Sequence, residues 1–166
     1  MQLDHYSSKF DKRTFPIIIV SENVANAPNI GSLFRTADAF GIEKLVLCGS
    51  HIPMGRKMAK TSRSTEKTVL FEISDNAEQV VADLKSEGYQ IIALEITSDS
   101  VPLSRFQIQK NRPIALVVGD ENFGVSETIL SLSDQNVHIE MFGQNSSMNV
   151  VQATSVTLYE ITKQLS

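Results

Sequence analysis

Three short polar segments carry most of the side chains that could do chemistry, and each follows an apolar run. The segments are 29–35, 119–124 and 143–149, and they hold an arginine, carboxylates and several carboxamides. In an open α/β sheet, ligands bind in the crevice outside the carboxyl ends of the strands. The sequence therefore predicts that the three segments converge on one pocket.

The second segment has the glycine spacing of a phosphate-binding loop but the wrong charge. Val125 stands where the lysine of a P-loop would reach the phosphates, and Asp120 and Glu121 place negative charge beside them. No G-x-G-x-x-G opens the first helix, so a dinucleotide fingerprint is missing as well. Carboxylates and glycines suit a ligand that is rich in donors or positively charged, and S-adenosylmethionine meets that description.

Short apolar runs alternate with helical spacing, which predicts an α/β domain with a largely parallel sheet. Residues 1–14 are polar and predict a short N-terminal extension to a single domain that covers 1–166. Asp75 is the expected N-cap of the second helix, which ends at Gly88. The expected strands are 15–20, 44–48, 69–73, 90–96, 113–118 and 137–139, and the expected helices are 30–40, 75–88 and 148–163.

Composition narrows the class of protein. The net charge of −4 and the pI near 5.4 argue against a chain that coats nucleic acid by bulk charge. Cys48 lies in an apolar run and is expected in the core, and His5, His51 and His138 lack metal-ligand spacing, so no metal site is expected. No signal peptide opens the sequence and no run is long enough to cross a bilayer, so we expect a soluble cytoplasmic protein.

The chain resembles the SpoU family of ribose 2′-O-methyltransferases, within the SPOUT or trefoil-knot superfamily. Three motifs carry the resemblance, in the family's order and spacing, and the match covers nearly everything after residue 16. They are Asn29-Ile30-Gly31-Ser32-Leu33-Phe34-Arg35, Gly119-Asp120-Glu121-Asn122-Phe123-Gly124-Val125-Ser126, and 139–160 with Ser147-Met148-Asn149 at its centre. The branch it looks most like methylates transfer RNA at a loop guanosine.

The resemblance implies a fold and a cofactor. The C-terminal segment would be threaded through a loop as a trefoil knot, a rare exception to the rule against knots. S-adenosylmethionine would lie in that knot, held by main-chain groups of Leu94, Gly119, Ile139 and Met148. The protein would be a homodimer with its site at or near the subunit interface. One departure is Glu140, which stands where the family usually has proline and adds a charge beside the cofactor.

Arg35 is the first candidate catalytic residue that the resemblance supplies. It falls one helical turn after Gly31, so it could point toward the loops. A guanidinium is a poor base, and a safer role is to clamp a phosphate and stabilise the forming alkoxide. The alternative is a surface arginine paired with Asp38.

Four further residues are candidates for the catalytic site. Asn29 precedes the expected helix, so an N-cap and an orienting role are both open. Glu121 is either an exposed loop acid or a site residue between two glycines. Ser147 and Asn149 could simply begin the last helix, with Ser147 as its cap, although the resemblance makes them site residues.

The segment 53–67 is strongly basic. Its local charge is +4, which leaves −8 for the rest of the chain. If the segment is helical, residues 56, 60, 63 and 67 share one face. Such a patch would grip a few phosphates with little sequence preference, although a solvated lysine-rich loop is the alternative. The candidate RNA-binding residues are Arg56, Lys57, Lys60 and Arg63.

The sequence thus predicts an S-adenosylmethionine-dependent RNA ribose 2′-O-methyltransferase that acts on tRNA. The enzymatic rival is the same reaction on ribosomal RNA. The rival from another class is a catalytically silent RNA-binding protein with the same fold.

Overall fold

A computed structural model describes residues 1–166. Its elements alternate as the apolar runs indicate: β1 (Phe15–Glu22), α1 (Ala27–Ala39), β2 (Ile42–Cys48), α2 (Arg56–Ser62), η1 (Thr65–Lys67), β3 (Phe71–Ser74), α3 (Ala77–Ser86), β4 (Gln90–Leu94), β5 (Val101–Pro102), η2 (Leu103–Arg105), β6 (Ile114–Gly119), α4 (Glu127–Leu132), β7 (Gln135–His138) and α5 (Val150–Leu165).

Seven strands form one sheet in the order β3-β2-β1-β6-β4-β7-β5, and every pairing in it is parallel. The predicted α/β class with a parallel sheet is confirmed. Strand β6 lies between β1 and β4, although it comes after both of them in the chain. Polar segments that follow β1, β4 and β6 therefore leave the same edge of the sheet side by side.

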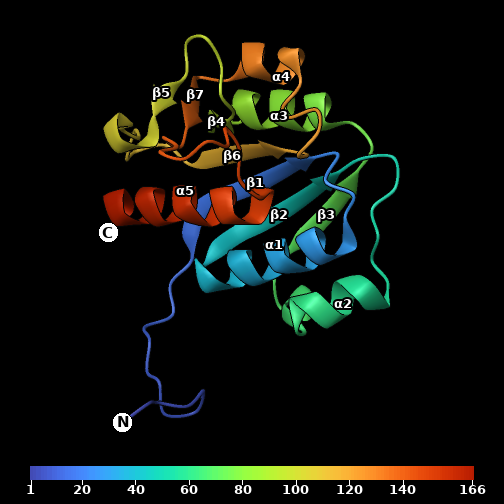
Figure 1. Cartoon of the computed structure of the whole chain (residues 1–166), viewed down its shortest axis with the longest axis vertical. Helices are drawn as coiled ribbons and strands as arrows, with labels where there is room; N and C mark the ends of the chain where they lie inside the picture. Colours follow the sequence, from blue (N-terminus) through green and yellow to red (C-terminus); the bar gives the residue numbers. More distant parts are fainter.

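Helices cover both faces of the sheet (Figure 1), so most residues of its central strands are buried and apolar. Ile17 and Ile19 of β1 pack with α1, α2 and α5, whereas Ile18 and Val20 pack with α3 and α4. Successive strand residues point to opposite faces, which is why one short run supplies two cores.

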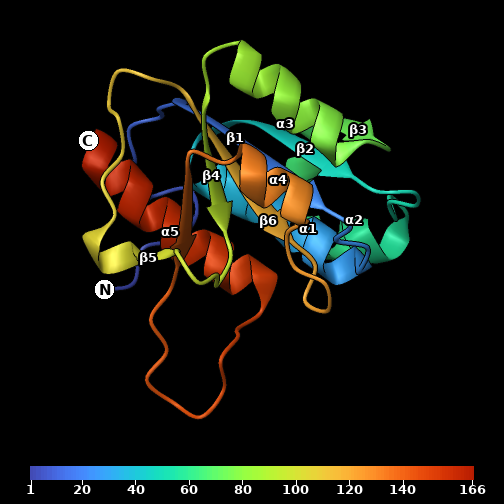
Figure 2. The same cartoon turned by 90° about the horizontal axis from the view of Figure 1, so that it is seen from above.

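The last helix returns to the middle of the molecule after a long excursion. From β6 at the centre the chain passes through α4 to β7, then through a projecting loop that Figure 2 shows in orange-red, and α5 packs back against α1, β4 and β6. The threading of this segment through a loop stays a prediction from the resemblance.

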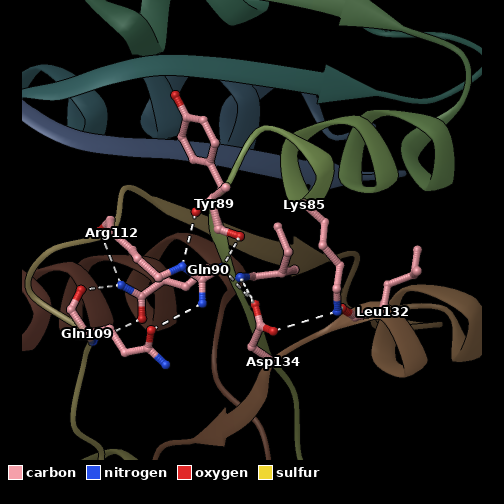
Figure 3. A network of polar contacts seen from close by, with 9 residues as sticks. Lys85, Tyr89, Gln90, Gln109, Arg112, Leu132 and Asp134 are labelled. Carbon is pink, nitrogen blue, oxygen red and sulfur yellow. Dashed lines mark hydrogen bonds and ion pairs between the residues drawn. The ribbon is translucent and has the colours of Figure 1, made fainter.

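A polar network (Figure 3) ties together the amino-terminal ends of β4, β6 and β7. Asp134, just before β7, accepts a hydrogen bond from the backbone N–H of Ile91 in β4 at 2.7 Å. Lys85 of α3 and Arg112, just before β6, lie 3.6 and 3.9 Å from the same carboxylate. One side chain thus joins four segments at the edge that carries no candidate site.

Three predicted helix caps are wrong by one to three residues. Asn26, not Asn29, caps α1, because its side chain accepts from the backbone N–H of Asn29 at 3.0 Å. Asn76 caps α3 in place of Asp75, since β3 runs on to Ser74 and displaces the turn. Asn149 caps α5 in place of Ser147, accepting from two backbone N–H groups.

The predicted four-residue basic face is also wrong. Helix α2 ends at Ser62, and Arg63 and Ser64 take left-handed φ angles of 52° and 71°. Only Arg56 and Lys60, four residues apart, share a helical face. After Ser62 the chain reverses direction and enters the η1 turn. The apolar pattern of the sequence does not predict this reversal. Helix α4 and strand β5 were likewise not predicted, since both are too short to show a period.

Candidate active site at the carboxyl ends of the strands

A cavity of about 710 Å³ opens at the carboxyl ends of β4 and β6. Volumes of this order are typical of small-molecule sites. A smaller hollow of about 140 Å³ shares Leu94, Glu95 and Met148 with it and reaches Ile139. The larger cavity is lined by the residues that follow β4, by the loop after β6, by α4, by Asn136 of β7 and by the start of α5.

The two hollows bring together all four residues that were expected to hold the cofactor. Leu94 and Met148 line both, Gly119 lines the larger one and Ile139 the smaller one. Leu94 and Gly119 end β4 and β6, and Ile139 and Met148 lie between β7 and α5. The predicted segments 119–124 and 143–149 thus meet at the hollows, whereas no residue of 29–35 lines either of them.

The lining of the larger cavity is acidic. It contains Glu95, Asp99, Asp120, Glu121 and Glu127, and no lysine, arginine or histidine. The Thr97 hydroxyl donates to Asp99 at 2.7 Å and holds the pKa of that carboxyl below its usual range. A site with this charge disfavours phosphate groups and attracts a cation.

A chain of hydrogen bonds joins the three motifs beside the cavity. The Asn29 amide donates to Glu121 at 2.7 Å, and the Asn149 amide donates to the Asn29 oxygen at 3.1 Å. The Asn149 oxygen in turn accepts from the backbone N–H groups of Val151 and Gln152. Both ends of each carboxamide are used, so their orientation is fixed. Asn29, Glu121 and Asn149 therefore form one unit, as their prediction as site residues requires.

The loop after β6 is compact because its two glycines touch. A β-carbon at Gly119 would overlap the backbone of Gly124, and Gly124 has a φ of 65°, which L side chains rarely adopt. Asp120 accepts from the backbone N–H of Phe123 at 2.6 Å and tightens the turn. The glycine spacing thus serves a tight turn that presents Glu121 rather than a phosphate cradle.

Ser147 lines both hollows with an exposed side chain, so it lies at the predicted site without capping α5. Glu140, the residue in place of the family's proline, is exposed, accepts from Ser104 at 2.9 Å and lines neither hollow. Its neighbours Ile139 and Met141 line the smaller hollow, so the charge of Glu140 lies next to that hollow without forming part of its wall.

Arg35 is the predicted site residue that the fold does not bring to the cavity. Its side chain is exposed, lines neither hollow and forms no ion pair with Asp38. Gly31 packs against the backbone of Met58 in α2, and Arg35 lies one turn further along the same face of α1. Within one chain, this spacing places the backbone of Arg35 on the side of α1 that α2 covers further back, and no hydrogen bond or ion pair joins its side chain to Glu121.

The basic segment forms an exposed patch on that side. Arg56, Lys57, Lys60, Arg63 and Lys67 are all exposed, and none takes part in an ion pair. The acid of the segment, Glu66, accepts a hydrogen bond from Ser62, which holds its pKa below the usual range. The five cations are therefore available to an anionic partner.

Two glutamates at the site were missed from the sequence. Glu22 ends β1 and Glu95 follows β4, and both accept hydrogen bonds from the loop after β6. The available signal was a carboxylate at the end of an apolar strand run.

No group of three or more histidine, cysteine, aspartate or glutamate side chains is placed to hold a metal ion. No helix combines the length and apolar character needed to span a membrane.

The sequence of this chain matches a known protein family and several of its members. The SpoU rRNA Methylase family matches residues 16–159. A tRNA (guanosine(18)-2′-O)-methyltransferase of Aquifex aeolicus is 32% identical over 154 residues, 93% of this chain and 72% of that protein. The Escherichia coli enzyme of the same name is 30% identical, and this chain spans 66% of its length.

Solved structures show the same fold. The crystal structure of the Aquifex aeolicus TrmH/SpoU tRNA-modifying enzyme superposes with a TM-score of 0.82 at 32% identity, covering 92% of this chain and 77% of that one. An AdoMet-bound rRNA methyltransferase from Sinorhizobium meliloti has a TM-score of 0.83 at 21% identity, covering 95% and 59%. The latter likeness concerns the fold alone.

The superposition on the TrmH/SpoU enzyme, at 32% identity, places the protein in the SPOUT class of α/β methyltransferases. Within that class, the chain belongs to the SpoU rRNA methylase family.

Proposed function

We propose that the protein transfers a methyl group from S-adenosylmethionine to a ribose 2′-hydroxyl of RNA, with tRNA as the substrate. The observation that carries this proposal is the Glu121–Asn29–Asn149 chain, which joins the three family motifs at the rim of an acidic cavity. The relatives with the same chemistry in their names cover most of this chain.

The residues present fit the cofactor. Its sulfonium and amino groups are cationic, and the cavity offers five carboxylates and no competing cation. When bound, the cofactor supplies an electrophilic methyl carbon. Leu94, Gly119, Ile139 and Met148 are assigned to its binding through main-chain groups, a role that comes from the family resemblance.

The residues of the chain would act mainly by alignment. Methyl transfer to an oxygen is an in-line displacement, and holding the reacting atoms about 3 Å apart supplies much of the rate. Asn29, Glu121 and Asn149 orient the ribose, with Ser147 beside them at the cavity wall. Arg35 clamps the neighbouring phosphate and stabilises the oxygen as it loses its proton.

The role proposed for Arg35 implies a homodimer. Within one chain it does not line the cavity. In a homodimer, Arg35 of the partner subunit would complete the site. The exposed apolar side chains of α5, Val156 and Tyr159, are available for such an interface.

RNA would bind along the basic patch. Arg56, Lys57, Lys60 and Arg63 are exposed and unpaired cations in a chain whose remainder is acidic, so they are the natural contacts for phosphates. The chain 1–166 would act as one catalytic domain with residues 1–14 as an extension, in the cytoplasm, where tRNA is found.

The decisive experiment is methylation of a panel of RNAs in vitro. The protein would be incubated with S-adenosylmethionine and either transcribed tRNA or fragments of ribosomal RNA, and 2′-O-methyl nucleosides would be mapped by mass spectrometry. We expect a single 2′-O-methylated position in tRNA. Methylation of ribosomal RNA alone would favour the rival substrate, and no binding of S-adenosylmethionine at millimolar concentration would favour the silent RNA-binding protein.

A further inference from the structure

The loop that carries Glu121 is fastened from both sides by carboxylates that no motif contains. This loop, residues 119–126, follows β6, and β6 is flanked by β1 and β4. Each of these neighbours supplies one glutamate at its carboxyl end, Glu22 and Glu95. The two glutamates bind successive backbone N–H groups at the end of the loop.

Glu22 is buried without a cation. Its side chain is 7% exposed, forms no ion pair, and accepts from the backbone N–H of Ser126 at 2.9 Å. Burial, with Glu22 nearby, raises the pKa of the Cys48 thiol to about 11. An uncompensated buried carboxylate is costly, so an apolar side chain would serve packing better at this place. The hydrogen bond to the loop is the specific contact that the carboxylate provides.

Glu95 holds the loop from the opposite side. One of its carboxylate oxygens accepts from the backbone N–H of Val125 at 3.0 Å, and the other accepts from Ile96 at 3.0 Å. The carboxylate also lies against the α-carbon of Gly124, so that a β-carbon there would overlap it. Glu95 lines both hollows, which places this contact in the wall of the cofactor site.

We propose that Glu22 and Glu95 are positioning residues that fix the loop 119–126 in the geometry needed to bind S-adenosylmethionine, an inference that rests on the proposed function. Through the loop they set Glu121 in the cavity wall and within reach of Asn29. Neither glutamate takes part in the chemical step. The competing explanation is that both are ordinary contacts that stabilise the start of α4.

The conservative substitutions separate the two explanations. Glu22→Gln keeps an oxygen that accepts from Ser126, whereas Glu22→Ala removes it. At Glu95 both oxygens accept, so Glu95→Gln retains only one of the two bonds. We therefore expect Glu22→Gln to stay within about twofold of the unchanged protein in its Kd for S-adenosylmethionine. Glu22→Ala and Glu95→Ala should raise the Kd by about tenfold to a hundredfold, and Glu95→Gln should fall between, because small displacements of a positioned loop are amplified at the site.

The measurement is calorimetry with S-adenosylmethionine on proteins shown to be folded by circular dichroism, with KM and kcat on tRNA beside it. Glu87→Ala, at an exposed position distant from the loop, is the matched control. The KM for the cofactor should rise more than kcat falls. A folded Glu22→Ala protein that binds the cofactor as tightly as the unchanged protein overturns the proposal, and so does a Glu22→Gln protein as weak as Glu22→Ala.

A second measurement needs neither activity nor a variant. Amide hydrogen exchange in the unchanged protein should show the N–H groups of Val125 and Ser126 protected, and that of Asn122, exposed in the same loop, exchanging rapidly. Equal exchange at all three refutes the clamp even if the protein methylates RNA. Protection without any binding of S-adenosylmethionine keeps the contacts but ends both their assigned role and the proposed function.

Discussion

At the scale of single residues, the role of each polar side chain follows from its partners rather than from its type. Asn26, Asn29 and Asn149 are chemically identical, yet Asn26 only caps a helix, Asn29 links two motifs, and Asn149 does both. Arg35 has no partner within the chain. A cation that is exposed, unpaired and matched to a family motif is a strong candidate for contact with a substrate.

The replacement Arg35→Ala tests that assignment. We expect it to leave the affinity for S-adenosylmethionine unchanged, because Arg35 lines neither hollow, and to reduce methyl transfer by about a hundredfold or more. Single-turnover methylation with mapped product measures the second effect. Asp38→Ala, one turn along the same exposed face, is the control. An Arg35→Ala protein that methylates at the native rate shows that the assignment is wrong.

At the scale of elements, helix α1 contacts both the candidate active site and the basic helix α2. Its first turn holds Asn29 against the cavity loops, and Gly31 lets α2 approach closely enough for its backbone to touch. The basic patch is thereby attached to the same helix as the site. Helix α2 is only seven residues long, so its fixed position depends on packing against α1 rather than on helical propensity.

The patch should dominate the salt dependence of RNA binding. Each phosphate contact makes the slope of log K against log salt more negative, so changing Arg56, Lys57, Lys60 and Arg63 together to alanine should reduce the magnitude of that slope by about two to four. Fluorescence anisotropy of labelled tRNA at several salt concentrations measures it. Changing Lys9, Lys12 and Lys110, which are exposed elsewhere, is the control. An unchanged slope places the RNA on another surface.

At the scale of the whole molecule, the carboxyl ends and the amino ends of the parallel strands carry different features. The cavity lies at the carboxyl ends of the strands, and the network around Asp134 lies at their amino ends (Figure 3). The network joins α3, β4 and the starts of β6 and β7, so it stabilises strands that come from distant parts of the chain. Stability and function are therefore expected to respond to different substitutions.

Asp134→Ala tests this division. The change leaves the N–H of Ile91 without its acceptor and should lower the free energy of unfolding by about 1–3 kcal/mol. Urea denaturation measures the loss, and Asp75→Ala, at an exposed aspartate without a side-chain hydrogen bond, is the control. The Kd for S-adenosylmethionine should stay within about twofold. A stability equal to that of the control would show that the network contributes little.

The sequence by itself determined the fold class, six of the seven strands and the approach of the three motifs to one another, because apolar runs bounded by polar loops are local signals. Tertiary structure alone decided which asparagine caps which helix, that the basic segment breaks at Arg63, and that Glu22 and Glu95 hold the loop after β6. The last of these outcomes depends on a strand order that puts β6 between β1 and β4. Contacts between residues so far apart in the chain arise from packing, which leaves no periodic trace in the sequence.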